Sequence, residues 1–226
     1  MNFKEYFGFS EKDIKQNCII CQSFDISLFA DKISNGFFVK SAYIRNAIII
    51  ALKNNFLAGD AVLYLENTKC KNIILFSCCG GCNDIKCGDL IAVNKAYNLE
   101  SFSGMLNFCG VPNYYNSSKK LLLDFYKRNH CKNLIETNSA CVGSLVLESK
   151  FSEWFKENKI SVVDMESSII LSAAEKTKKD AVCLMYVSDL IGQDFIINGN
   201  DKLSKKRIAA SRKKLANMIL RFCNEK

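Results

Sequence analysis

The sequence of 226 residues predicts an α/β protein, a three-layer α/β/α sandwich around a twisted, mixed β-sheet. The order of the predicted segments along the chain supports this fold class. Short apolar, β-branched runs alternate along the chain with segments of helical periodicity. Such alternation favours a mostly parallel or mixed sheet with helices on both faces. No linker, repeat or low-complexity segment divides the chain, so residues 1–226 are expected to form a single domain.

The elements follow from local composition and periodicity. Residues 1–16 are expected to form a short helical lead-in. Apolar runs bounded by turn residues predict strands at 18–21, 37–39, 47–52, 72–76, 88–93, 134–137, 160–164 and 181–188. Helical periodicity predicts helices at 61–65, 121–130, 150–157, 166–178 and 204–223. Residues 77–82 are expected to form a loop, and 94–117, which include the single proline, a long loop that acts as a lid.

Composition limits the classes of function. The net charge is +8, but the basic residues are spread, and the denser cluster within 202–214 is interpreted as a solvated helix face. Binding to nucleic acid is not expected, because no aromatic-rich basic module is present. No run approaches the roughly 20 apolar residues that span a bilayer, and no signal peptide is evident at the start. A cytoplasmic location is therefore expected, with the twelve cysteines as reduced thiols.

Two acidic residues stand where predicted strands end. Glu166 follows the apolar strand at 160–164, and Asp189 ends the strand at 181–188. Ligands of open α/β sheets bind outside the carboxyl ends of the strands. At a helix start, Glu166 is expected to be ionised and to accept hydrogen bonds from a sugar diol. A partly desolvated Asp189 would have a raised pKa and could act as a general acid. Glycosyl cleavage is the expected chemistry; alternatively, Glu166 is only a helix-start acid and Asp189 only a cap.

These acids lie in segments that resemble a known family. Val163–Ser167 together with Val187–Asp189 resembles the paired signature of the nucleoside phosphorylase superfamily. Ile73–Gly81 followed by Gly88–Ile91 resembles the glycine-rich loop of that family and the strand after it. The resemblance extends over about residues 70–195. It implies the same three-layer, phosphorylase/hydrolase-like fold.

The resemblance also implies a role for individual residues. Glu166 would hold the ribose 2′- and 3′-hydroxyls, and Met165 would pack on the sugar. Asp189 would protonate the purine at N7 while Ser188 steadies it. Lys202 lies about where some purine-specific members have a basic partner for the acid. The Ser-Asp ending favours a purine, since uridine-specific members lack it. The wall that stacks on the base is expected within 140–151.

The acceptor of the sugar is less well defined. The family's phosphate-binding arginines are missing, since Leu75 occupies one position and the stretch 21–26 has none. The glutamate that activates water in hydrolytic members is replaced by Ile26, next to Asp25. Backbone N–H groups of the expected anion loop could still bind phosphate, as could Arg45 of a neighbouring subunit. The anion-loop residues are Ser77, Cys78, Cys79, Gly80 and Gly81. Phosphorolysis is preferred, with a nucleosidase that uses water or a non-catalytic nucleoside-binding homologue as alternatives.

The expected partners follow from the same resemblance. The ligand is a small-molecule nucleoside, and the chain is expected to form a homo-oligomer, a dimer or a trimer of dimers. No metal or organic cofactor is expected, with phosphate as a candidate co-substrate. The CxxC pairs Cys18/Cys21 and Cys79/Cys82 have zinc-ligand spacing, but inert thiols are preferred, because residues 18 and 21 would face opposite sides of a strand. A nucleophile pair of Cys109 and His130 has no supporting motif.

Overall fold

The computed structural model describes residues 3–8, 10–100, 114–130, 134–144, 148–192 and 202–224. The strands are β1 (Asn17–Gln22), β2 (Ile33–Asn35), β3 (Val39–Ile44), β4 (Ala47–Leu52), β5 (Asn72–Gly81), β6 (Leu90–Leu99), β7 (Tyr114–Asn116), β8 (Ile135–Val142), β9 (Ile160–Asp164) and β10 (Asp180–Leu190). The helices are α1 (Phe3–Phe7), α2 (Ala58–Leu63), α4 (Lys119–Asn129), α5 (Ser152–Glu157), α6 (Ser167–Lys176) and α7 (Lys202–Asn224).

The strands form one mixed sheet in the order β10-β6-β8-β9-β5-β1-β4-β3-β2, with β7 beside β6. β10 also pairs in parallel with β5, so β5, β10, β6, β8 and β9 form a closed ring of pairings. The twisted mixed sheet therefore closes on itself at this end. The ring brings the carboxyl ends of β5, β9 and β10 together, which a flat sheet of this order would not do.

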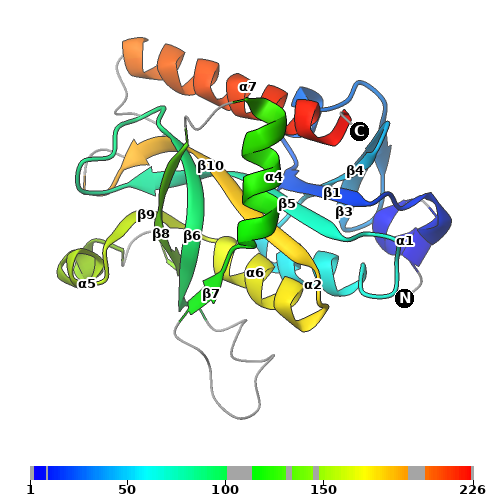
Figure 1. Ribbon diagram of the computed structural model, residues 1–226, viewed down its shortest axis with the longest axis horizontal. Coiled ribbons are helices and arrows are strands. Elements are labelled where there is room, and N and C mark those ends of the chain that lie inside the picture. Colours follow the sequence, from blue (N-terminus) through cyan, green and yellow to red (C-terminus); the bar gives the residue numbers. More distant parts are fainter. Residues whose placement is uncertain are drawn as a thin grey trace.

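Helices cover both faces of the sheet, as predicted. α2 and α6 lie on one face, and α4 and α7 lie on the other (Figure 1). Each face has its own apolar core, one with α6 residues such as Ile170 and the other with α7 residues such as Ile219. The two faces explain the nearly continuous apolar runs of β1 and β4, because strands buried on both sides have no polar face.

Three local expectations were wrong. Ser77–Gly81 is the second half of β5, not a loop, because it pairs with β10 along its length and Gly80 and Gly81 also pair with β9. Residues 94–99 continue β6, and Tyr114–Asn116 forms β7 against Lys95–Tyr97. The predicted lid therefore includes a strand pair, and its middle, 101–113, lies outside the described residues. The strand expected at 37–39 begins at Val39.

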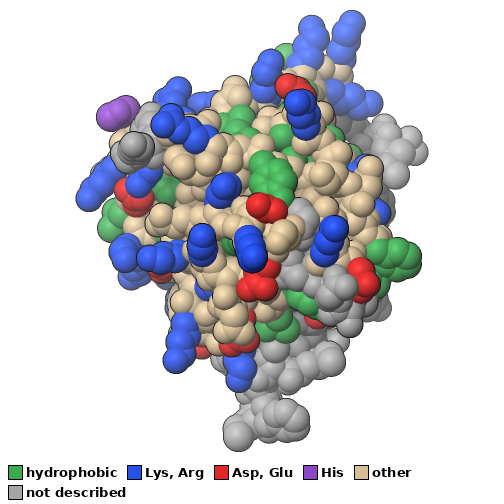
Figure 2. Space-filling model, turned by 90° about the vertical axis from the view of Figure 1, so that its right-hand side faces the viewer, with side chains coloured by type: hydrophobic (Ala, Val, Ile, Leu, Met, Phe, Trp, Pro, Cys, Tyr) green, Lys and Arg blue, Asp and Glu red, His purple; other side chains and the backbone are tan. Residues whose placement is uncertain are grey.

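The surface and the cysteines agree with the interpretation of composition. Lysine and arginine side chains occupy several separate places on the face that includes β3 and β4, with acidic side chains between them (Figure 2). Across the described ranges, no helix is both long and apolar enough to cross a bilayer. Cys18 and Cys21 lie in the apolar cores on opposite faces of the sheet, as the strand period predicts, so this pair cannot chelate one ion.

Candidate active site

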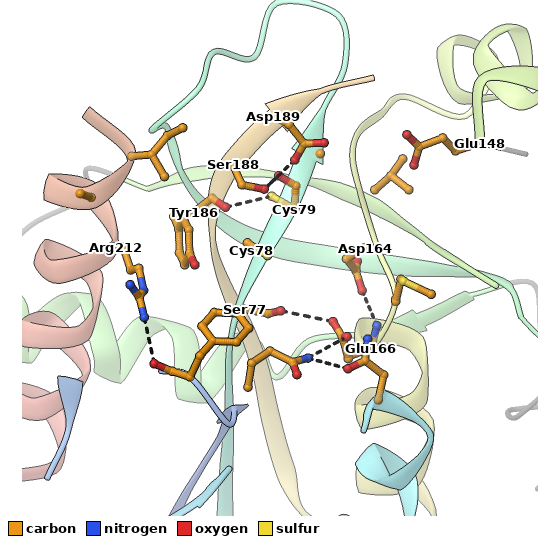
Figure 3. A pocket seen from close by; sticks show the side chains of 18 of the residues that line it. Ser77, Cys78, Cys79, Glu148, Asp164, Glu166, Tyr186, Ser188, Asp189 and Arg212 are labelled. Atoms are coloured by element: carbon orange, nitrogen blue, oxygen red, sulfur yellow. Dashed lines mark hydrogen bonds between the residues drawn. The ribbon is translucent and has the colours of Figure 1, made fainter. Parts of the chain in front are cut away.

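A cavity of about 740 Å³ opens at the carboxyl ends of β1, β5, β9 and β10. Most of the side chains expected in the site line it, namely Ser77, Cys78, Cys79, Gly80, Met165, Glu166, Ser188 and Asp189. Gly81 does not line the cavity. A Cβ at this position would lie 2.9 Å from the Ile85 side chain, so Gly81 packs closely against Ile85. Glu166 and Asp189 therefore share one hollow, with Asp189 above and Glu166 below (Figure 3).

Glu166 lies at the floor of the cavity, at the N-cap position of α6. One carboxylate oxygen accepts a hydrogen bond from Gln22 Nε2 at 3.0 Å, and the other accepts one from Ser77 Oγ at 3.2 Å (Figure 3). Burial, aided by the charge of Asp164, raises the pKa of Glu166 to about 8. Burial therefore opposes the ionised form that the helix start was expected to favour, because the loss of hydration acts against the helix dipole.

Asp164 fixes the turn that presents Glu166. Its carboxylate accepts hydrogen bonds from the backbone N–H groups of Glu166 at 2.8 Å and Ser167 at 2.6 Å. It also accepts one from Ser167 Oγ at 2.6 Å, and that hydroxyl lies 2.8 Å from Ser139 Oγ. Asp164 thus satisfies N–H groups that a helix leaves unpaired at its start. The Asp-Met-Glu-Ser order of this segment therefore has a local structural cause.

A β-bulge places Asp189 in the cavity. The pairing of β10 with β5 shifts between Val187 and Asp189, so Ser188 is an extra residue in the strand. Consecutive residues of a regular strand point to opposite faces, whereas here Ser188 and Asp189 both line the cavity. Bulges re-aim side chains in this way near functional sites. The sequence predicted the acid at this position but not the irregularity that directs it.

Ser188 holds Asp189 in position at the cavity. Ser188 Oγ lies 2.6 Å from Asp189 Oδ1 and 3.3 Å from the carbonyl oxygen of Cys79. Ser188 Oγ donates to the Asp189 carboxyl, and this hydrogen bond lowers the pKa of Asp189 against the larger effect of burial. Burial thus raises the pKa of Asp189, as the sequence predicted. A carboxyl with a raised pKa therefore faces the cavity.

Helix α7 forms a wall of the cavity with Lys205 and Arg212. Arg212 Nε donates to Asp25 Oδ1 at 2.6 Å, and its Nη2 donates to the carbonyl oxygen of Phe24 at 3.2 Å. Asp25 is fully buried, and burial raises its pKa to about 6 although Arg212 lowers it. Lys202, expected beside the acid, is exposed at the start of α7 and does not line the cavity, where Lys205 stands instead.

Several lining residues were not anticipated. Gln22 ends β1 and connects Glu166 to Asn55, to which its amide donates at 2.8 Å. Its place at the carboxyl end of an apolar strand was a usable signal. Glu148 lies in the short 3-10 turn Glu148–Phe151, within the stretch expected to hold the base. Nothing in its neighbourhood in the sequence marks it. Residues 145–147 of that stretch lie outside the described part of the chain.

The fold and this cavity define an α/β protein with two acids at the carboxyl ends of β9 and β10, the strands on either side of β5. The family model for the phosphorylase superfamily matches residues 56–224, and the chain belongs to that superfamily. Its members include enzymes that act on nucleosides, both phosphorylases and nucleosidases. No curated protein matches the sequence closely enough to serve as a relative.

Solved structures agree with this assignment at the level of the fold. A uridine phosphorylase from Vibrio fischeri ES114 superposes with a TM-score of 0.80 at 15% identity, over 100% of this chain and 99% of that chain. An AMP nucleosidase from Bacteroides thetaiotaomicron has a TM-score of 0.75 at 18% identity, covering 97% and 94%. A 5′-methylthioadenosine/S-adenosylhomocysteine nucleosidase from Campylobacter jejuni has a TM-score of 0.72 at 14% identity, covering 92% and 98%.

Proposed function

We propose that this protein cleaves the N-glycosidic bond of a purine nucleoside. The observation that supports the proposal most strongly is the shared cavity of Glu166 and Asp189, which come from opposite sides of one hollow. A carboxylate that accepts from two hydroxyls and a carboxylic acid that donates one proton are complementary to the two halves of a nucleoside. Gln22 and Ser77 hold Glu166 in position for this role.

In the proposed reaction, Glu166 accepts hydrogen bonds from the ribose 2′- and 3′-hydroxyls, and Met165 packs on the sugar. Asp189 gives its proton to N7 of the base. The C1′–N9 electron pair then leaves with the neutral base, and the sugar passes through an oxocarbenium-like state. An acceptor adds at C1′. Proton transfer of this kind contributes about 10²–10⁴-fold to rate.

For the acceptor, the arrangement of charge in the cavity favours water over the expected phosphate. The cationic side chains among the described lining residues are Lys205 and Arg212, both on α7. Arg212 is engaged by Asp25, so a phosphate would have to compete with a buried carboxylate for it. Around Glu166 the donors are neutral, from Gln22 and Ser77. Phosphate binding normally relies on guanidinium or ammonium donors.

The anion loop also differs from the expectation. Residues 77–81 all pair with β10, and Gly80 and Gly81 also pair with β9, so this segment is an extended strand and not the open cradle that an anion loop provides. We therefore propose a nucleosidase, with phosphorolysis as the alternative. A phosphate-independent rate would support hydrolysis, and a rate that requires phosphate would support phosphorolysis.

The test is a panel of purine and pyrimidine nucleosides incubated with the enzyme, first without phosphate and then with it, while free base is measured by chromatography. Release of a purine base is the expected result. Asp189→Asn is expected to abolish most turnover while nucleoside binding persists, and Glu157→Gln, at an exposed position of α5, serves as the control. Binding without release of any base would instead support a non-catalytic nucleoside-binding protein.

We also propose that the chain forms a homo-oligomer, a dimer or a trimer of dimers. Phe24, Phe37 and Phe56 are 61%, 78% and 79% exposed, and contact with a second copy would bury this apolar surface. Phe24 lines the cavity, and Phe56 follows the lining residue Asn55, so a second copy over these rings would cover the cavity mouth. Arg45 is exposed in the turn between β3 and β4. Sedimentation analysis that finds only a monomer at micromolar concentration would refute this proposal.

A further inference from the structure

A second carboxyl group lies at the Asp189 end of the cavity. Glu148 reaches in from the turn before α5, and its carboxyl points toward Asp189 across the upper part of the cavity (Figure 3). No described side chain forms a hydrogen bond or ion pair with it. The family-like mechanism proposed above uses Asp189 at this end and gives Glu148 no role. An unpartnered, half-buried carboxyl beside a proposed proton donor therefore needs an explanation.

The two carboxyls are not independent. Burial and the negative charge of Asp189 together raise the pKa of Glu148 to about 7, and burial raises that of Asp189. The other charged groups that line the cavity are Asp164 and Glu166 near its floor and Lys205 and Arg212 on α7. Two like charges in one site resist ionising together, so the pair can hold one proton between them, on either carboxyl. The pair then offers one donor and one acceptor.

Purine bases differ in what they present along the edge that contains N7. Adenine has an acceptor at N7 and a donor in its 6-amino group, whereas guanine has two acceptors, N7 and O6. Hypoxanthine, with O6, matches guanine on this edge. A pair with one donor and one acceptor complements adenine. A 6-oxopurine would need both carboxyls protonated, or would leave a carboxylate facing O6.

We propose that Glu148 is a specificity residue that accepts a hydrogen bond from the 6-amino group of the base while Asp189 donates to N7, so that the site selects 6-aminopurine nucleosides. The inference rests on the proposed function for the placement of the base, and it adds the class of base. Because Glu148 lies in a short turn and has no partner among the described residues, its substitution is not expected to unfold the protein.

The experiment compares kcat/KM for adenosine and inosine in the wild type, Glu148→Gln, Glu148→Ala and the control Glu157→Gln. The wild type is expected to prefer adenosine. Losing a hydrogen bond to a charged group is expected to reduce the adenosine-to-inosine ratio about 10–100-fold in Glu148→Ala. Glu148→Gln is expected to reduce the ratio through a faster inosine reaction, because its amide can donate to O6. The control ratio is expected to match the wild type.

Equilibrium binding of free adenine and free hypoxanthine to the same four proteins separates the two proposals. If no nucleoside is cleaved but the preference for adenine depends on Glu148, the proposed function fails and this inference stands. If bases are released with an adenosine-to-inosine ratio that stays within about threefold of the wild type in both Glu148 variants, the inference is overturned and the proposed function survives. Wild-type preference for inosine, or no binding of either base, would also overturn it.

Discussion

Replacing Glu166 by glutamine is expected to stabilise the protein while it removes the proposed sugar contact. The carboxyl is 3% exposed, and burial raises its pKa from 4.5 to about 8. Because the folded-state pKa lies above that of the unfolded chain, the stability contributed by the neutral carboxyl is complete below about pH 4.5 and is lost as the pH rises to about 8. The amide of Glu166→Gln is uncharged, so the variant does not lose this stability as the pH rises.

The magnitude follows from the same values. Each pH unit between the two pKa values costs about 1.4 kcal/mol of folding free energy, so the wild type is less stable at pH 7 by about 3 kcal/mol than it would be with a neutral group. The introduced amide would keep both contacts, since its oxygen can accept from Gln22 and its nitrogen can donate to Ser77 Oγ. A net gain of about 2–3 kcal/mol is expected, which is roughly 5–10 °C in Tm for a chain of this size.

The assay is urea unfolding of wild type, Glu166→Gln and the exposed control Glu157→Gln at pH 5 and at pH 8. The stability advantage of Glu166→Gln is expected to be small at pH 5 and large at pH 8, while the control stays within about 0.5 kcal/mol of the wild type at both. Equal advantages at the two pH values, or a variant less stable than wild type at pH 8, would refute the argument that burial dominates the charge state of Glu166.

Three further substitutions test the structure of the site. Asp189→Asn is expected to reduce base release by about 10²–10⁴-fold. In the same variant, NMR titration is expected to find the Glu148 pKa below about 7, because the negative charge of Asp189 is removed. An unchanged Glu148 pKa would contradict the coupling of the two carboxyls. Arg212→Met removes the counterion of buried Asp25, whose Oδ2 has no hydrogen-bond partner among the described residues, and is expected to destabilise the fold by about 3 kcal/mol at pH 8. Because the Asp25 pKa is raised, its carboxyl is more often neutral at low pH, so the loss of stability is expected to be smaller at pH 5. It is also expected to be smaller in the double variant with Asp25→Asn. An equal loss of stability at both pH values would contradict this account. Gly81→Ala places a Cβ 2.9 Å from Ile85 and 3.0 Å from Val187, and is expected to reduce the free energy of unfolding by about 1–3 kcal/mol. In the control Gly143→Ala, the new Cβ lies 3.8 Å from Glu100. This control is expected to be near neutral in the same denaturation assay.

The central strands could be predicted because their composition leaves few alternatives. The apolar runs of β1, β4 and β10 are too short and too β-branched for helices, and they match the observed strands within a few residues. The second half of β5 could not be found in this way, because Ser-Cys-Cys-Gly-Gly has the composition of a turn. Pairing with β10 and β9 overrides that local preference, and pairing across about a hundred residues has no local signal.

In the site, too, residues with a local signal could be predicted and residues with only long-range contacts could not. Glu166 and Asp189 could be predicted because each ends an apolar strand, and the edge of a sheet is where such residues converge. Gln22 lies 144 residues from Glu166 in sequence, and Arg212 lies 187 residues from Asp25. Their contacts depend on how β1 and α7 pack against the rest of the fold. The opposing effect of burial on the Glu166 pKa could not be predicted, because the helix dipole is a local effect, whereas the degree of burial is set by the complete cavity.

The charge balance of the cavity links these findings. Its described lining includes the carboxyls of Glu148, Asp164, Glu166 and Asp189, while one of its two cations, Arg212, is bound to Asp25. Burial is the largest cause of the raised pKa of each of these four carboxyls, and a cation that is already bound to Asp25 offsets it little. A site of this kind is complementary to a neutral ligand rich in hydroxyl and amino donors. The same excess of acid opposes an inorganic anion, so the proposed specificity for a nucleoside and the proposed use of water as the acceptor have one electrostatic cause.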